Sequence, residues 1–160
     1  PVVDLLHKFK VGVKLNTVVT SLNKDDDMTD IVRRIHPHRW KIFQALRIDG
    51  ENEEDIGELE VADQAFDSYV ERHRQVLADL VNTQVVAENN EAMLGTYAMI
   101  DPRGFVYTNA EGTYRYSSQT MLDMGFSKAW KEVSSGFSEA AFQARDGEWD
   151  WNRETVGGEA

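Results

Sequence analysis

The stretch "VGVKLNTVV" at residues 11–19 decides how the rest of the chain is interpreted. Valine and leucine recur at alternate positions, which is typical of a β-strand. Side chains alternate between the two faces of a strand, so Lys14 and Asn16 share the face opposite Leu15. One apolar and one polar face predict a strand that packs under helices on one side and meets water or a ligand on the other.

Working outward, the pattern alternates between helices and strands over the first 90 residues. Apolar residues at helical spacing predict helices at 1–10, 28–35 and 61–77. β-prone runs predict strands at 11–19, 39–48 and 82–90. Regular alternation of this kind implies right-handed crossovers, and therefore an α/β fold with a parallel sheet.

The alternation of predicted helices and strands ends near residue 95. Asp101, Pro102 and Gly104 stand where a type I turn favours them, so we expect a hairpin of 97–100 against 105–108. Short helices are expected within 118–125, 127–133 and 138–145. These elements suggest three parts, namely a sheet-and-helix part at 1–95, an extension at 96–151 and a flexible tail at 152–160.

Composition excludes several classes of protein. The chain has 160 residues, of which 41% are hydrophobic, enough for one globular unit with a sizeable core. The formal charge of −11 argues against a broad electrostatic contact with nucleic acid. With no cysteine, this stretch supplies no disulfide, thiolate metal site or iron–sulfur ligand. No apolar run approaches the length of a bilayer span, so we expect no membrane contact from this segment.

The polar face of residues 11–19 is the first candidate site. A lysine inside a sheet protein is unfavourable unless an anion meets it, and ligands collect at the carboxyl ends of parallel strands. Lys14 and Asn16 are therefore candidate ligand-binding residues. The alternative is an edge or antiparallel strand whose polar face is simply wet.

Other candidates are weaker. His36 and His38 flank Pro37 and suggest a metal pair, but without a third ligand a surface turn is favoured and no metal site is predicted. His7 and His73 fall in amphipathic helices, where we expect half-buried positions. Near the C-terminal end, Trp149 and Trp151 either cap the core or stack on a base.

Five segments together resemble the C-terminal half of the viperin family of radical S-adenosylmethionine enzymes, which includes fungal and microbial members. The similarity runs in order through nearly the whole chain, with one small gap after the hairpin. The second segment carries most of the weight. The segments are "VKLNTVVTSLNKDDDM", "RWKIFQALRIDGEN", "FDSYVERHR", "TMLDMGF" and "ARDGEWDW".

The resemblance implies a partial (β/α) barrel that holds S-adenosylmethionine and a [4Fe-4S] cluster on a Cys-x-x-x-Cys-x-x-Cys loop. In this family a 5′-deoxyadenosyl radical takes hydrogen from C4′ of CTP, and loss of water yields the antiviral chain terminator 3′-deoxy-3′,4′-didehydro-CTP. This chain lacks the cysteine loop and opens at Pro1 without an initiator methionine. We therefore expect a lyase fragment that needs the N-terminal half of the barrel as its partner.

The resemblance also implies roles for individual residues. Lys14 and Asn16 fall where the family faces the nucleoside triphosphate at the mouth of the barrel. Arg115, in a loop, falls close to a second phosphate-binding position, where arginine would bind bidentately. Tyr97 matches a tyrosine at the nucleotide site and is the candidate catalytic residue. Asn52, in the "DGEN" loop, is the candidate residue for binding the adenosyl cofactor.

Several expectations stay open at the level of sequence. The same chemistry on UTP or another nucleotide, and a non-catalytic half-barrel that binds a nucleotide or a protein, are alternatives to CTP dehydration. Vertebrate members end on a tryptophan that engages cytosolic iron–sulfur assembly proteins, whereas this chain continues through "NRETVGGEA". A cytoplasmic location is expected, with membrane association of the full-length protein through a preceding segment as the alternative.

Overall fold

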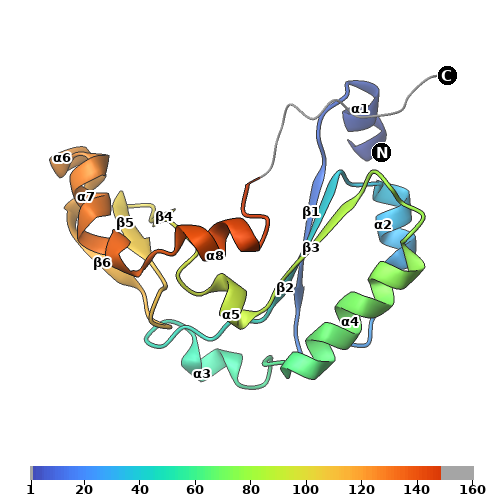
Figure 1. Ribbon diagram of the computed structural model, residues 1–160, viewed down its shortest axis with the longest axis horizontal. Coiled ribbons are helices and arrows are strands. Elements are labelled where there is room, and N and C mark those ends of the chain that lie inside the picture. The colour runs from blue at the N-terminus through green and yellow to red at the C-terminus, as the bar shows by residue number, and fades with distance from the viewer. Residues whose placement is uncertain (1, 149–160) are drawn as a thin grey trace. The chain divides into compact units, whose positions relative to one another are not determined.

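The computed structural model describes residues 2–148 (Figure 1). These residues form two compact units, and each is described by itself. The first unit contains residues 2–45 and 61–89, and the second contains 46–60 and 90–148. The segment 152–160 and the two tryptophans at 149 and 151, for which the sequence suggested a tail and a core cap, lie outside the described residues.

The first unit contains a parallel sheet of three strands, which confirms the predicted α/β class. Strand β1 covers Lys14–Val19, β2 covers Arg39–Gln44 and β3 covers Gln84–Glu88, in the order β1-β2-β3. Lys14 pairs with Arg39, which in turn pairs with Gln84. Parallel neighbours in register point their side chains to the same side, so this pairing fixes which residues share each face.

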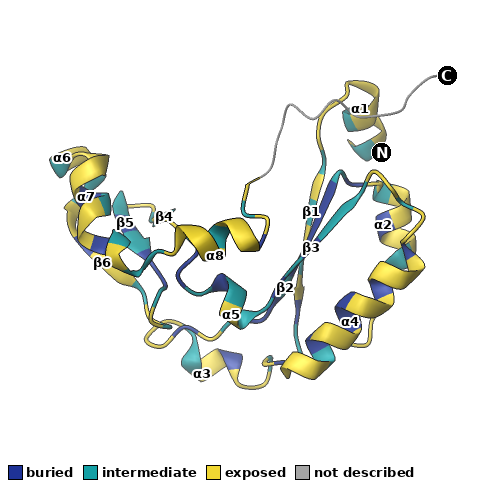
Figure 2. Cartoon of the chain, in the orientation of Figure 1, coloured by how far each residue is buried: buried dark blue, intermediate teal, exposed yellow. Residues whose placement is uncertain are grey.

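Helices cover one face of this sheet (Figure 1). Helix α2 (Thr29–Ile35) and helix α4 (Asp63–Val76) bury their apolar sides against it, and α1 (Val2–Lys8) precedes β1. Figure 2 shows buried residues on β2 and along one side of α4. Each fully buried apolar side chain contributes about 1.5–3 kcal/mol. The buried core is formed by Val19, Val32, Trp40, Ile42, Val61, Phe66, Tyr69, Val70 and Leu77.

The prediction of half-buried positions for His7 and His73 was wrong, because His7 is exposed and His73 is buried beside this core. Its side chain is 1% exposed, and the backbone N–H of Met28 donates to its Nε2 over 2.9 Å. Its Nδ1 lies 2.8 Å from the carbonyl oxygen of Tyr69, one turn earlier. Burial also raises the pKa of Tyr69 to about 12. His73 therefore joins the start of α2 to the last turn of α4.

Strand β2 is shorter than the predicted strand at 39–48. Its neighbour β1 ends at Val19, and the N–H of Ala45 makes the last ladder bond, to the carbonyl of Val19, over 2.9 Å. Beyond that point the backbone has no β1 residue with which to pair. Residues 46–60 leave the sheet, belong to the second unit, and include a short helix that the sequence did not predict, α3 (Glu53–Ile56).

The second unit contains an antiparallel sheet in the order β4-β5-β6. The predicted hairpin is confirmed by β4 (Met99–Ile100) and β5 (Phe105–Thr108), while β6 (Arg115–Thr120) lies in a segment predicted as a loop. Helix α7 (Phe126–Val133) packs on this sheet through an apolar cluster around Val106. The remaining helices of the unit are α5 (Asn90–Met93), α6 (Met121–Met124), the 3-10 turn Ser134–Gly136 and α8 (Glu139–Ala144).

The hairpin turn follows the chemistry expected from its residues. The Asp101 carboxylate accepts from the backbone N–H groups of Arg103 and Phe105, each over 2.9 Å. Gly104 has a φ of +92°, a backbone conformation that L side chains rarely adopt. Farther along, the Ser138 hydroxyl accepts from the Ala141 N–H at the start of α8, as the sequence predicts for a helix cap.

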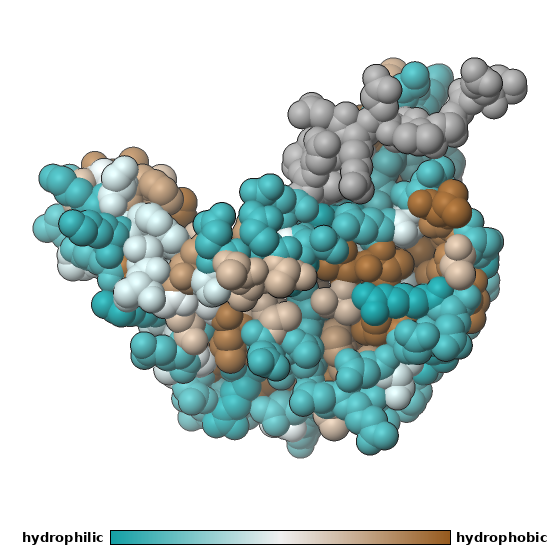
Figure 3. Space-filling view, in the orientation of Figure 1, coloured by the Kyte–Doolittle hydropathy of each residue, from teal (hydrophilic) through white to brown (hydrophobic). Residues whose placement is uncertain are grey.

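The surface in the orientation of Figure 3 is largely hydrophilic over α4. Among residues 2–148 no helix combines the length and the apolar character needed to cross a bilayer.

Replacing His73 with leucine should lower the free energy of unfolding by about 1–3 kcal/mol, because the half-buried Met28 N–H loses its acceptor. The measurement is chemical denaturation of the full-length protein. His7→Leu, at an exposed position of α1, is the matched control and should change stability by less than about 0.5 kcal/mol. Equal stability of the two variants would contradict the role given to His73.

Candidate functional site

The second face of the parallel sheet carries the polar residues of the first unit. Register places Lys14 beside Arg39 and Asn16 beside Lys41, while Glu88 lies at the end of β3 on the same side. The complete face consists of Lys14, Asn16, Val18, Arg39, Lys41, Phe43, Gln84, Val86 and Glu88. Leu15 lies on the opposite, helix-covered side, as its position in the sequence predicts.

Exposure differs across this face. Strand β1 is an edge strand, and its residues Lys14 and Asn16 are exposed. On the central strand, Arg39 is only 1% exposed and Lys41 only 5% exposed. The sequence left open that 11–19 is an edge or antiparallel strand whose polar face meets water. Strand β1 is an edge strand, but it pairs in parallel. The polar face is therefore open at β1 and enclosed at β2.

Charge on this face is opposite in sign to that of the chain. It holds three cations, Lys14, Arg39 and Lys41, and one carboxylate, Glu88, whereas the formal charge of the whole chain is −11. Lys41 and Glu88 form a buried ion pair. One exposed cation, Lys14, with two buried cations beside it suits a small anion rather than a polyanion such as nucleic acid.

The cations are displaced toward one end of the sheet. Lys14 is the first residue of β1 and Arg39 is the first residue of β2, so both lie at the amino ends of the strands. The expectation that ligand-binding residues collect at the carboxyl ends therefore does not describe Lys14. Glu88 is the last residue of β3 and marks the carboxyl end of the same face.

Arg39, Lys41 and Glu88 were missed as candidates, although the sequence contains a signal for the first two. The stretch "RWKIF" at residues 39–43 alternates charged and apolar side chains as "VKLNT" does at 13–17. Two neighbouring parallel strands with the same period of two bring their charges to one face. Glu88 gives no such signal, because it is a single acidic residue at the end of an apolar run.

Tyr97 lies in the second unit, immediately before β4. The guanidinium of Arg145 lies 4.3 Å from the centre of its ring, within the range of a cation–π contact. Nη2 of the same arginine donates to the carbonyl of Thr96 over 2.9 Å. Arg145 therefore fixes the backbone and the ring of this segment together.

Arg115 also lies in the second unit, but it begins strand β6 and does not lie in the predicted loop. It is exposed, and its Nη1 donates to Ser135 Oγ over 3.2 Å. Strand β5 separates β6 from β4, so Arg115 and Tyr97 are on different sides of the central strand of this sheet. A hollow of about 10 Å³ beside Arg115 has room for about one water molecule.

The side chain of Asn52 is bonded to its own loop. Its Oδ1 accepts from the Ile48 N–H over 2.8 Å, and its Nδ2 donates to the Leu46 carbonyl over 3.1 Å. The N–H of Asp49 further donates to the Gly112 carbonyl of the second unit over 2.9 Å. These bonds give Asn52 a structural role in the "DGEN" loop, independent of any cofactor.

Three histidines come closer together than the sequence suggested. The ring of His7 lies 6.5 Å from that of His36 and 6.3 Å from that of His38, measured between centroids. However, the Val13 N–H donates to Nδ1 of His38 over 3.1 Å, so this ring nitrogen is bonded to the backbone. No group of three or more histidine, aspartate or glutamate residues within 2–148 is arranged to hold a metal ion.

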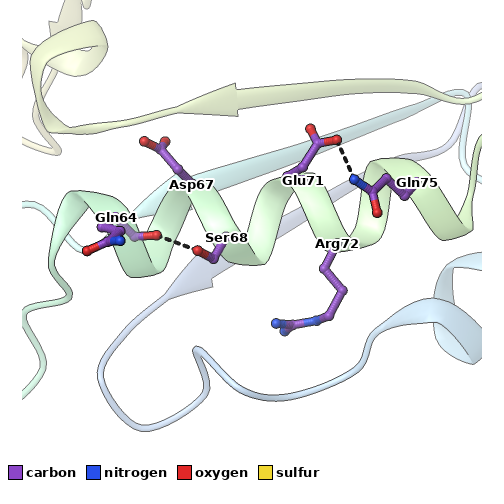
Figure 4. A pocket seen from close by; sticks show the side chains of 6 residues that line it. All are labelled: Gln64, Asp67, Ser68, Glu71, Arg72 and Gln75. Atoms are coloured by element: carbon purple, nitrogen blue, oxygen red, sulfur yellow. Dashed lines mark hydrogen bonds between the residues drawn. The ribbon is translucent and has the colours of Figure 1, made fainter.

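An open depression of about 640 Å³ lies over the outer side of α4 (Figure 4). Its polar groups are largely bonded within the protein: Gln75 donates to Glu71, and the Ser68 hydroxyl donates to the Gln64 carbonyl. Arg72 reaches back to the carbonyl of Asp26 over 3.1 Å. Because α4 covers the apolar face of the sheet, this depression is separate from the polar face.

Comparison with known proteins gives one consistent result. The chain is 36% identical over 149 residues to an S-adenosylmethionine-dependent nucleotide dehydratase of Flammeovirga pacifica, covering 93% of this chain and 48% of that protein. A dehydratase of the same name from Lacinutrix mariniflava is 31% identical over 94% of this chain and 30% of its own length. The dehydratase RSAD2 of Siniperca chuatsi is 35% identical, with coverage of 94% and 44%. No protein-family model matches the chain.

These relatives are of one class, enzymes named for nucleotide dehydration that depends on S-adenosylmethionine. The chain spans about half the length, or less, of the curated relatives it matches. It is a viperin-like sequence that corresponds to the C-terminal part of these dehydratases, which confirms the resemblance found in the sequence.

Replacing Asn52 with alanine should increase hydrogen exchange at the Ile48 amide by about fivefold in the absence of any cofactor, because one hydrogen bond of about 1 kcal/mol is lost. Amide exchange of the full-length protein, followed by mass spectrometry or NMR, provides the measurement. Glu51→Ala, at an exposed position in the same loop, is the control and should leave that amide unchanged. Unchanged exchange in Asn52→Ala would remove the structural role.

Proposed function

We propose that this chain is the nucleotide-binding part of a radical S-adenosylmethionine nucleotide dehydratase, and that its substrate is CTP. The observation that carries the proposal is the cationic face of the parallel sheet, on which Lys14, Asn16, Arg39 and Lys41 lie side by side in register. The similarity to enzymes named as nucleotide dehydratases supports it.

The charge of the ligand matches this face. A triphosphate carries about four negative charges near neutral pH, and ammonium and guanidinium groups bind phosphate through charge-assisted hydrogen bonds. Lys14 and Arg39, at the amino ends of β1 and β2, would hold the phosphates. Asn16 has an amide that donates and accepts, which suits the ribose or a bridging oxygen.

Tyr97 and Arg115 are proposed as further nucleotide-binding residues of the complete enzyme, with Tyr97 as the candidate catalytic residue. The Tyr97 phenol can donate to a ribose or phosphate oxygen, and its ring is held by Arg145. Arg115 is exposed and can bind a phosphate bidentately.

The proposed chemistry needs groups that this chain does not supply. The sequence contains no cysteine, so its residues do not fit a [4Fe-4S] cluster, and no step through the cluster follows from them. Asn52, the candidate for the S-adenosylmethionine site, has its amide bonded to the surrounding loop. We propose that a preceding half of the barrel supplies the cluster and most of the cofactor site, with cytosolic iron–sulfur assembly proteins as candidates for loading it.

The edge of the sheet supports this partner. Among the strands within residues 2–148, β1 pairs with β2 alone, and its side chains on the polar face include Val18, which is 52% exposed. An unpaired edge of this kind readily accepts another strand. We propose that the strands of the preceding half continue the sheet from β1 and complete a partial (β/α) barrel in a cytoplasmic enzyme.

A non-catalytic half-barrel that binds a nucleotide or a protein is the second candidate, and absence of a cysteine loop from the preceding sequence would favour it. A cysteine loop in the preceding sequence of the same polypeptide would favour the enzyme. The same chemistry on UTP or another nucleotide is distinguished by competition binding, because the residues that read the base are not identified.

Replacing Lys14 with alanine should weaken CTP binding by the full-length protein by about 10-fold to 100-fold, the effect of losing one charge-assisted bond worth about 1.5–3 kcal/mol. Isothermal titration calorimetry gives the affinity directly. Lys8→Ala removes an equal charge from helix α1, outside the sheet, and should change the affinity by less than about twofold. Equal affinities for wild type and Lys14→Ala would refute the site.

A further inference from the structure

Glu88 is a fully buried carboxylate on the proposed ligand-binding face. It is 0% exposed, and it forms an ion pair with Lys41, which is 5% exposed. Register pairs Glu88 with Phe43 and Lys41 with Val86, so the ammonium reaches along its own strand toward the carboxyl end. The same ammonium lies 5.2 Å from the centre of the Phe43 ring.

Burial alone would remove the charge of Lys41. A lysine taken out of water favours its neutral form, and its pKa falls by several units when no opposite charge is near. The neighbouring cations Lys14 on β1 and Arg39 on β2 act in the same direction. Glu88 is the acidic residue that the three strands place on this face, and its negative charge favours the protonated form of Lys41.

A purely stabilising role does not explain the pair well. Bringing two charges out of water takes several kcal/mol per ion, and well-packed apolar residues in place of a buried ion pair are often as stable or more so. The pair lies on the polar face, on the side of the sheet away from the apolar core of α2 and α4. This position is where a charged lysine is useful for binding an anion.

We propose that Glu88 is a positioning residue that holds Lys41 as an ammonium ion on the polar face, behind the open strand β1, so that its charge acts on an anion bound at Lys14 and Asn16. The proposal deepens the proposed function and rests on it for the identity of the anion, a nucleoside triphosphate. Glu88 does not contact the ligand in this account; it acts through Lys41. Charge on Lys41 is then independent of pH across the neutral range.

The first test needs no nucleotide. The pKa of Lys41 is measured in the full-length protein by NMR titration of ¹³C-labelled lysine, with Lys41→Arg identifying the resonance. In Glu88→Gln the pKa should fall by about 1–3 units below the wild-type value. Glu139→Gln, at an exposed position of α8, is the matched control and should leave it unchanged. An unchanged pKa in Glu88→Gln would overturn the proposal.

The second test follows CTP affinity against pH. Between pH 7 and 10 the affinity of Glu88→Gln should fall more steeply than that of wild type, because Lys41 loses its proton. The double variant Lys41→Arg/Glu88→Gln should restore the wild-type profile, since arginine stays protonated. A merely structural role would lower affinity equally at every pH, and parallel profiles would contradict the proposal.

A further variant covers the case in which Glu88→Gln does not fold. In Lys41→Met the buried carboxylate of Glu88 loses its cation, so it should bind a proton more readily than in the wild-type protein. Equal proton binding by Glu88 in Lys41→Met and in the wild-type protein, followed by NMR, would overturn the proposal. Failure of the proposed function gives a different pattern. In that case Lys14→Ala would leave CTP affinity unchanged, while Glu88→Gln would still lower the pKa of Lys41.

Discussion

Alternation of side chains along three parallel strands is the constraint on which the first unit depends. With a period of two, Leu15, Trp40 and Ile42 must point one way and Lys14, Arg39 and Lys41 the other. The first set is buried under α2 and α4 and provides the hydrophobic free energy of folding. The second set is thereby brought together on the opposite side, so core packing and the collection of charge are two results of one register.

The register limits which ligand can bind. A shift of one residue on β2 would put Trp40 and Ile42 on the polar face and Arg39 and Lys41 in the core, which the cost of burying unpaired charge excludes. The cationic face is consequently as well fixed as the core itself. Its buried ion pair of Lys41 and Glu88 adds a group that reaches along the strand, from the cation-rich amino ends toward the carboxyl end.

Sequence patterns predicted those parts of the fold in which apolar side chains alternate clearly. The shared face of Lys14 and Asn16 and the parallel order of the strands are examples, while the hairpin around Asp101 was predicted from its turn residues. Strand β6 was missed because "RYSSQT" shows no apolar alternation. Its central contact is a hydrogen bond from the Val106 N–H to the Ser117 hydroxyl, over 3.1 Å.

The candidate site was only partly predictable for a related reason. Periodicity in one strand tells which residues share a face, but the partners from other strands depend on register, a tertiary property. The pairing of β2 with β1 shows that Arg39 and Lys41 lie on this face, and the pairing of β3 with β2 shows the same for Glu88. His73 was misassigned because its buried position depends on two backbone partners, Met28 and Tyr69, one of them 45 residues away.

A crystal structure of the full-length protein with CTP bound tests the central claim most directly. The account predicts phosphate oxygens within about 3 Å of Lys14 Nζ and of the Arg39 guanidinium, on the face of the sheet opposite α2 and α4. A triphosphate bound elsewhere, with no contact to either side chain, would contradict it.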